Sequence, residues 1–267
     1  MPDAPDPTLP EPPALTETVF SALEDKAALK TGPRITLGLL AGVYIGLGGL
    51  FALIALAGAE AMPYGVAQIL AGLVFALGLA LVMVGGAELF TGNTLMIGPV
   101  AHGRIPASTA AVALAVVYLA NFAGSGLLAL LVLASGLHEA GEGAVGRAAL
   151  DLGATKTEKG AGQLLASGIL ANMLVCLAVW LAYGGKTVTQ KLVALTLPIA
   201  AFVAAGFEHS VANMFLLPYA ALVGAATDTA PTVTAAGMAT NLAMSTIGNL
   251  IGGGIIALAY GRAYMSR

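Results

Sequence analysis

Long apolar runs alternate with short polar connections along the chain. A helix needs about 20 apolar residues to cross the hydrocarbon core of a bilayer, and six runs fit this requirement. The pattern therefore predicts an all-α membrane protein with six transmembrane helices. We expect the spans at residues 35–57, 66–86 with an uneven continuation to 100, 108–134, 164–183, 192–205 with a continuation to 217, and 233–260.

Polar residues interrupt the second and fifth apolar runs. They are Glu88, Thr91 and Asn93 in the second run, and Glu208, His209, Ser210 and Asn213 in the fifth. Irregular backbone is tolerated at membrane depth only where it is buried in protein or lines a cavity. We therefore expect both of these helices to be broken around a polar site.

The two halves of the chain are similar to each other. The stretch NFAGSGLLAL at 121–130 matches NLIGGGIIAL at 249–258, and the spacing of Glu88 and Asn93 returns in Glu208 and Asn213. Each half holds three spans, an odd number, so the second half enters the membrane from the opposite side. The sequence predicts two inverted three-helix repeats whose broken helices form a substrate site near the midplane. Chance similarity between Gly- and Ala-rich segments is the alternative.

Composition supports a membrane protein and narrows the chemistry. Only 9% of the residues are charged, against about 25% in soluble domains, so most of the surface must face lipid. The net charge of −3 gives no reason to expect nucleic-acid binding. The single cysteine, Cys176, excludes an intramolecular disulfide and a cysteine-based metal site. The sequence contains no catalytic triad, metal cluster or phosphate loop, so we expect neither an enzyme nor a cofactor.

The distribution of Lys and Arg predicts the orientation. Eight of these residues fall on one side of the predicted spans and three on the other, which places both termini in the cytoplasm of a bacterial cell, with the protein in the inner membrane. We divide the chain into a cytoplasmic leader at 1–30, which holds a short amphipathic helix at 16–30, a transmembrane domain at 31–262 and a cytoplasmic tail at 263–267. Residues 135–160 then form the long external loop.

The carboxylates and amides at the interruptions suit a structural role. Glu88 and Glu208 can accept hydrogen bonds from backbone N–H groups that the breaks set free, and Asn93 and Asn213 can bridge donors and acceptors. This interpretation carries more weight than a direct role in transport. A helix that restarts after a break has about half a positive charge at its N-terminus. Two such ends near a pore favour an anion.

His209 is the only histidine within a predicted span. An ionisable residue in the membrane is a functional hypothesis by default, and histidine changes its charge near neutral pH. His209 can therefore host a proton or polarise a small anion. The alternative is a neutral histidine that is hydrogen-bonded to Thr91 or Asn172 for packing alone.

Four segments carry a resemblance to a known family. GFEHSVANM at 206–214, AELFTGN at 87–93, IGNLIGGG at 247–254 and GILANMLVCLAVW at 168–180 resemble signatures of the formate/nitrite transporter family, over about residues 18–262. The resemblance implies an aquaporin-like protomer and a homopentamer with one pore in each protomer. It implies transport of a small monovalent anion of a weak acid with proton exchange at a central histidine. Formate is the first choice of substrate, and nitrite and hydrosulfide are the alternatives.

The resemblance also assigns residues to the pore. His209 is similar to the central histidine of the family, with Thr91 and Asn172 as its neighbours and Asn249 as a polar lining residue, while Lys156 matches a lysine that draws anions to the vestibule. Two apolar constrictions are implied, one at Phe75, Leu79 and Phe202 and the other at Leu89, Phe90 and Val175.

Two other classes of protein remain as alternatives. An aquaporin-type channel for neutral solutes shares the architecture, but its two Asn-Pro-Ala motifs are replaced by Thr-Gly-Asn-Thr and Val-Ala-Asn-Met. A membrane protein with a purely structural role is opposed by the polar residues at matched positions within the spans, because such groups are costly to keep in a membrane.

Overall fold

The computed structural model describes residues 9–229 and 233–265, and these residues fold into helices joined by short connections. The first helix, α1 (Pro12–Ala28), is followed by α2 (Thr31–Leu56), the 3-10 turn η1 (Ala59–Ala61), α3 (Tyr64–Gly85), α4 (Phe90–Asn93), η2 (Thr94–Met96), α5 (Ile97–Ala101) and α6 (Ala107–Ala134). The second part contains η3 (Leu137–Glu139), α7 (Ala144–Glu158), α8 (Ala161–Gly184), α9 (Val188–Ala204), α10 (Ser210–Ala226) and α11 (Ala235–Tyr264). Residues 1–8 of the predicted leader and 266–267 of the predicted tail lie outside the described residues.

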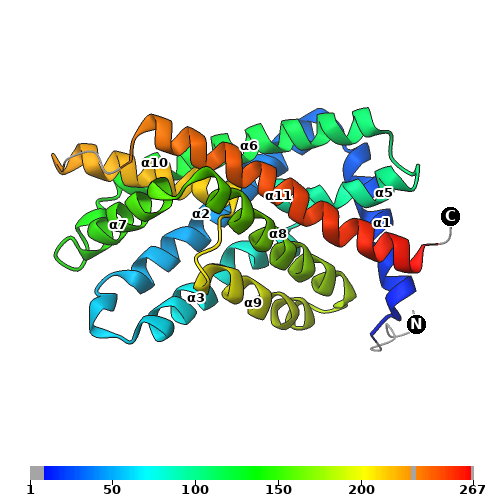
Figure 1. Cartoon of the computed structure of the whole chain (residues 1–267), viewed down its shortest axis with the longest axis horizontal. Helices are drawn as coiled ribbons and strands as arrows, with labels where there is room; N and C mark the ends of the chain where they lie inside the picture. The colour runs from blue at the N-terminus through cyan, green and yellow to red at the C-terminus, as the bar shows by residue number, and fades with distance from the viewer. Residues whose placement is uncertain (1–8, 230–232, 266–267) are drawn as a thin grey trace, which may run out of the picture.

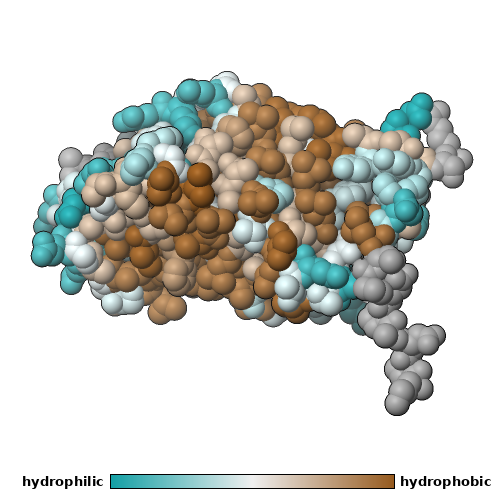
Figure 2. All heavy atoms as spheres, turned by 90° about the horizontal axis from the view of Figure 1, so that it is seen from below, coloured by the Kyte–Doolittle hydropathy of each residue, from teal (hydrophilic) through white to brown (hydrophobic). Residues whose placement is uncertain are grey.

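Five helices of the described chain are long and apolar enough to cross a membrane: α2, α3, α6, α8 and α11. The predicted fifth span corresponds to two shorter apolar helices, α9 and α10, of 17 residues each. Figure 2 shows a broad hydrophobic surface over the middle of the molecule, with hydrophilic residues gathered at its two ends. This distribution is the one expected of a multi-pass membrane protein.

The long helices run side by side along the longest axis of the molecule (Figure 1). Glycines let two pairs of them approach closely. A Cβ added to Gly124 of α6 would lie 2.1 Å from the carbonyl oxygen of Leu39 on α2, and one added to Gly252 of α11 would lie 2.3 Å from that of Ile169 on α8. Lipid supplies no hydrophobic drive between helices, so close backbone contact of this kind replaces it.

Helix α1 packs on the bundle, at the same end of the molecule as the C-terminal end of α11 (Figure 1). It begins at Pro12, four residues before the predicted amphipathic helix at 16–30, and proline is well tolerated in the first turn of a helix. Val19, Phe20 and Leu23 are buried against the bundle, as is Ala27. The apolar face expected from the sequence therefore packs against protein.

The segment at 135–160, predicted as a connecting loop, contains a helix, α7. Its buried residues include Val145, Ala149, Leu150 and Gly153, which recur at helical spacing. The helix is short and mostly polar outside this face, so its sequence lacks the long apolar run that marks a membrane span. Helix α7 lies at the end of the molecule opposite α1 (Figure 1).

Candidate functional site

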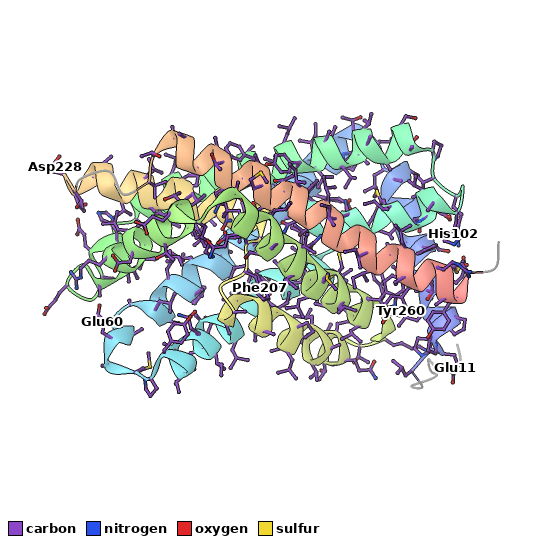
Figure 3. The ribbon with its side chains drawn as sticks, viewed as in Figure 1. Glu11, Glu60, His102, Phe207, Asp228 and Tyr260 are labelled. Atoms are coloured by element: carbon purple, nitrogen blue, oxygen red, sulfur yellow. The ribbon has the colours of Figure 1, made fainter. Side chains whose placement is uncertain are left out.

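Two non-helical connections separate α3 from α4 and α9 from α10, and each has a glycine among its first two residues. Gly86 has φ 73° and Gly206 has φ 66°, a left-handed conformation that favours glycine over residues with a side chain. The last residues before the new helices, Leu89 and His209, have similar extended backbones, with φ −102° and ψ 121° in one and φ −108° and ψ 113° in the other. Phe207, in the second connection, lies near the middle of the long axis, far from Glu60 and His102 at the two ends (Figure 3).

Asn121 of α6 holds the first connection. Its Oδ1 accepts a hydrogen bond from the Phe90 N–H at 2.9 Å, and its Nδ2 donates to the carbonyl oxygens of Gly38 at 2.7 Å and Glu88 at 2.9 Å. A buried backbone group without a partner is costly, and this one amide satisfies three of them. Asn121 was not among the predicted site residues, although the match between the segments starting at Asn121 and Asn249 is the signal that marks it.

Asn249 of α11 makes the equivalent contacts at the second connection. Its Oδ1 accepts from the Ser210 N–H at 2.8 Å, and its Nδ2 donates to the carbonyl oxygens of Gly168 at 2.8 Å and Glu208 at 3.0 Å. The resemblance assigned Asn249 to the lining of the pore. In the structure its side chain is fully buried, and all of these contacts are made to backbone.

The glutamates at the connections bind side chains. Glu88 contacts Lys26 of α1 through Oε1, with 2.6 Å between Oε1 and Nζ, and accepts a hydrogen bond from Asn93 at 2.7 Å through Oε2. The sequence analysis expected these carboxylates to accept from freed backbone N–H groups. Instead, Asn121 and Asn249 supply the acceptors for those N–H groups, which leaves the carboxylates to neutralise lysines.

Glu208 is surrounded by more donors than Glu88. Its Oε2 lies 3.1 Å from Lys156 Nζ and accepts from Asn213 at 2.6 Å and Asn241 at 3.2 Å, while its Oε1 lies 2.6 Å from Lys159 Nζ. Lys156, which the resemblance placed in an open vestibule, is buried here against this carboxylate. Burying a charge is costly unless it is paired and hydrogen-bonded, and this cluster meets both conditions.

His209 joins the second connection to α4, which lies 118 residues earlier in the sequence. Its Nε2 lies 2.9 Å from Thr91 Oγ1, and its Nδ1 accepts a hydrogen bond from the Ala212 N–H at 3.0 Å, so the ring serves as the N-cap of α10. Because Nδ1 accepts, this network assigns the proton of a neutral ring to Nε2, which donates to Thr91. Asn172, the other expected neighbour, donates to the carbonyl oxygen of Thr91 at 3.2 Å and to that of Asn249 at 2.6 Å.

Apolar rings cover one side of the histidine. The Phe202 ring stacks on the imidazole of His209 with 5.6 Å between centroids, and the edge of Phe75 meets Phe202 at 5.5 Å. Leu79, one turn after Phe75, is also buried. The first predicted constriction is thus a cluster of buried apolar residues in α3 and α9, two of which pack against each other and one against the histidine.

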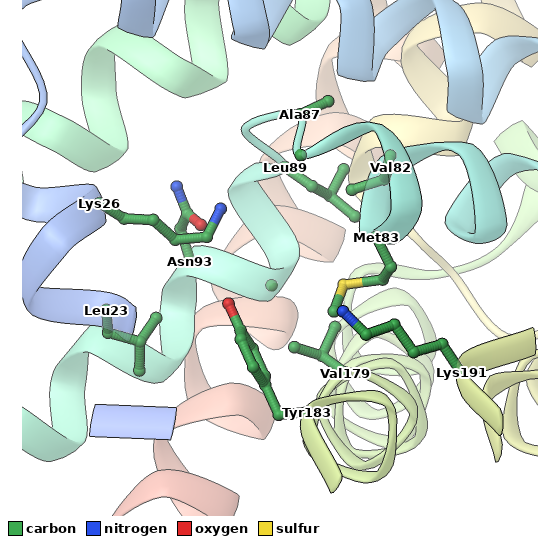
Figure 4. A pocket seen from close by; sticks show the side chains of 12 residues that line it. Leu23, Lys26, Val82, Met83, Ala87, Leu89, Asn93, Val179, Tyr183 and Lys191 are labelled. Carbon is green, nitrogen blue, oxygen red and sulfur yellow. The ribbon is translucent and has the colours of Figure 1, made fainter. Parts of the chain in front are cut away.

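The residues of the second predicted constriction are buried, and one of them lines a cavity. Leu89 lines a cavity of about 80 Å³ near α1 (Figure 4). The Phe90 ring packs against Tyr118 of α6 with 5.0 Å between centroids. Val175 of α8 is 1% exposed, and neither it nor Phe90 lines that cavity.

Fold and site together define a multi-pass helical membrane protein with a buried polar centre between two non-helical connections. The family described as "Formate/nitrite transporter" matches residues 13–261. The chain is 36% identical over 268 residues to "Formate channel FocA" of Escherichia coli (strain K12), which covers 95% of this chain and 94% of the relative. It is 34% identical over 270 residues to "Probable formate transporter" of Methanothermobacter thermautotrophicus, covering 93% and 94% of the two chains.

Solved structures of two channels are also similar to this chain. A "Pentameric formate channel with formate bound" superposes with a TM-score of 0.82 at 34% identity, covering 88% of this chain and 98% of that one. An "FNT family ion channel" superposes with a TM-score of 0.81 at 28% identity, covering 95% and 99%. The chain belongs to the formate/nitrite transporter family. These relatives are named as channels or transporters, which points to transport and away from an enzyme.

Proposed function

We propose that this protein carries small monovalent anions of weak acids, formate first, across the bacterial inner membrane, with both termini in the cytoplasm. Relatives along nearly the whole chain are named formate channels, and one similar structure is a pentamer with formate bound. We therefore extend to this chain a homopentamer with one pore in each protomer. The observation that carries the proposal is the contact between His209 and Thr91, which joins the second connection to α4 beside the Phe202 ring that stacks on the imidazole.

The proposal includes an aquaporin-like protomer built from two inverted repeats of three helices. In it, α3 and the short helices after it form a broken second span, and α9 with α10 forms a broken fifth span. The paired glycines at 86 and 206 and the paired asparagines at 121 and 249 support this arrangement. Broken helices at repeat interfaces are the usual place for substrate sites in transporters.

The site suits the anion of a weak acid, whose charge a proton can neutralise. A bare anion between apolar side chains is strongly disfavoured, so a weak acid crosses such a region more readily in its neutral form. When the hydrogen bond between His209 and Thr91 breaks, the Nε2–H of His209 can donate to the anion instead. The N-terminal ends of α4 and α10 add partial positive charge at the same level; α4 is short, so the greater part comes from α10.

Proton exchange at His209 has a structural requirement. A ring that gives up its Nε2 proton must hold another on Nδ1, and Nδ1 accepts the N–H of Ala212 in the structure. We propose that His209 donates only a hydrogen bond while it caps α10, and that it exchanges a proton only after this cap opens. Losing an N-cap costs about 0.5–2 kcal/mol, which is small enough for the cap to open during transport.

Uptake of labelled formate into proteoliposomes, at acidic and neutral pH and with nitrite as competitor, tests the function. We expect formate uptake that increases at acidic pH. His209→Asn keeps an acceptor for the cap of α10 but removes the imidazole, and we expect it to lower uptake about tenfold or more, which corresponds to the loss of one strong hydrogen bond to a charged group. Pentamer formation, measured by size-exclusion chromatography, should be unchanged.

The same experiment separates the alternatives. Strong nitrite flux with poor formate flux would make nitrite the substrate and leave the site intact. Uptake by His209→Asn equal to that of the wild type at every pH would contradict the role of the histidine. Flux of glycerol or water without anion flux would indicate a neutral-solute channel, and no flux of any solute would indicate a structural protein.

A further inference from the structure

One cavity of about 80 Å³ lies directly beside the predicted constriction at Leu89 (Figure 4). Residues of α1, α3, α4, α8 and α9 line it, together with the connection after α3. They include Gly92, the neighbour of Thr91, so the cavity ends next to the contact between Thr91 and His209. It lies toward the end of the molecule that carries α1, and we call this end the N-terminal face.

Four polar side chains line this cavity, from α1, α4, α8 and α9, and Asn93 of α4 already donates to Glu88. The ammonium groups of Lys26 and Lys191 and the hydroxyl of Tyr183 extend toward one another from α1, α9 and α8 (Figure 4). The remaining lining is mainly apolar, with Val82, Met83 and Val179 among it. A polar cluster in an apolar chamber fits a small polar solute.

The two lysines differ in their partners. Lys26 is bound to Glu88 at 2.6 Å. Among the described residues, the ammonium of Lys191 has neither a hydrogen bond nor an ion pair, although the side chain is half-buried. Glu88 already forms an ion pair with Lys26. Asp25, the residue before Lys26 on α1, is exposed and does not line the cavity. One positive charge in the cavity is therefore left without an ion-pair partner in the part of the chain that the structure describes.

At the opposite connection, both lysines beside the carboxylate are paired with it. There Glu208 binds both Lys156 and Lys159, one through each oxygen. The free ammonium is thus a feature of the N-terminal face that the similarity of the two halves does not explain. Its position is fixed by the chain before it: Thr187 and Gln190 form a capping box at the start of α9, so the first turn that carries Lys191 is well defined.

We propose that Lys191 captures the transported anion at the N-terminal face, in the cavity between α1, α8 and α9, before the anion passes Leu89. This inference rests on the proposed function and adds a specific residue to it. A positive charge in a cleft with apolar walls raises the local concentration of anions and their rate of association. The hydroxyl of Tyr183, which has no hydrogen-bond partner among the described residues, can donate to the second oxygen of a carboxylate such as formate.

The test uses Lys191→Met in right-side-out and inside-out membrane vesicles, so that formate can be offered to each face separately. We expect the formate concentration for half-maximal flux from the N-terminal face to rise about three- to tenfold, the scale of a lost electrostatic attraction. The dependence of flux on ionic strength at low formate concentration should become weaker. From the opposite face, the half-maximal concentration should change less than twofold.

Two matched variants separate charge from folding. Lys191→Arg keeps the positive charge and should retain flux close to that of the wild type. Lys30→Met removes an exposed lysine near the same face that does not line the cavity, and it should leave the half-maximal concentration unchanged. An unchanged value for Lys191→Met, or an equal rise for Lys30→Met, would overturn the inference. Failure of the wild-type protein to move any weak-acid anion would overturn the proposed function itself.

Discussion

At the scale of single residues, two asparagines decide how the chain can leave a helix inside the bundle. Asn121 and Asn249 each bind one backbone N–H and two carbonyl oxygens at a connection. Aspartate could accept the N–H but could donate to neither carbonyl, and leucine could do neither. The polar connections are therefore stable because an amide supplies both kinds of partner.

Asn249→Ala tests this role. The substitution leaves the buried N–H of Ser210 without its acceptor, and an unsatisfied buried group costs about 1–3 kcal/mol. We expect a lower unfolding temperature in detergent together with a loss of transport. Thr246→Ala, one turn earlier on α11, removes a hydroxyl that donates to another hydroxyl, Tyr118 Oη, and not to a backbone group, and it should have the smaller effect. Equal melting temperatures for the wild type and Asn249→Ala would contradict the bridging role.

At the scale of elements, ion pairs hold α1 to the connection between α5 and α6. Arg104 of this connection binds Glu17 through two hydrogen bonds, of 2.9 and 2.7 Å, and also contacts Glu24. The hydrogen bonds that Arg104 donates lower the pKa of Glu17, and the acceptance of these bonds by Glu17 and Glu24 raises the pKa of Arg104. The α1 helix therefore depends on charges that lie at the surface, as well as on its buried face.

The shifted pKa of Glu17 gives a direction for pH dependence. Because its folded pKa is below its unfolded value, the pair stabilises the docked helix above the unfolded pKa of about 4.3 and loses this contribution as the pH falls through the folded pKa. Arg104 stays charged throughout this range. We expect lower protection of the α1 amides against hydrogen exchange below about pH 4, measured by mass spectrometry and corrected for the pH dependence of exchange in unfolded peptides.

Arg104→Ala should produce the same change at neutral pH. The effect will be modest, since Glu17 is half exposed and surface pairs contribute little. Arg147→Ala, on α7 at the opposite end, is the control and should leave the exchange of α1 unchanged. Exchange in α1 that stayed the same in Arg104→Ala would show that the apolar face alone holds the helix.

At the scale of the whole molecule, close helix crossings set the distance between the elements that carry the site. Helix α6 crosses α2 at Gly124 and carries Asn121 one turn earlier, and α11 crosses α8 at Gly252 and carries Asn249 one turn earlier. The positions of the two asparagines at the connections thus depend on the two helix crossings. A change in helix spacing would move the asparagines away from the backbone groups that they bind.

Gly124→Ala should separate α2 from α6, because its Cβ would lie 2.1 Å from the carbonyl oxygen of Leu39. We expect a lower unfolding temperature and reduced transport. Gly126→Ala is a matched control in the same helix, with no atom within 4 Å of its added Cβ. Alanine favours a helix over glycine by about 0.8–1 kcal/mol, so this variant should be as stable as the wild type or more so. Equal effects of the two substitutions would contradict the packing argument.

The sequence by itself determined the class of protein, the regions of the long helices and the family. Runs of apolar residues are a local property, and a bilayer imposes a fixed length on them, so the five long helices lie where the sequence predicted spans. The two connections were also visible, because Glu, Asn and His within apolar runs have few uses outside a buried site. The short motifs at 87–93 and 206–214 were enough to indicate the family.

Only the tertiary structure decided which side chains meet. Lys26 binds Glu88, 62 residues away in the sequence, and His209 contacts Thr91, 118 residues away. No local sequence pattern specifies such pairs. The same holds for Asn121, for the buried face of α7 and for Lys191, whose position in a cavity depends on five helices. A hydrogen bond or a free charge is a relation between distant parts of the chain, so it exists only after the helices have packed.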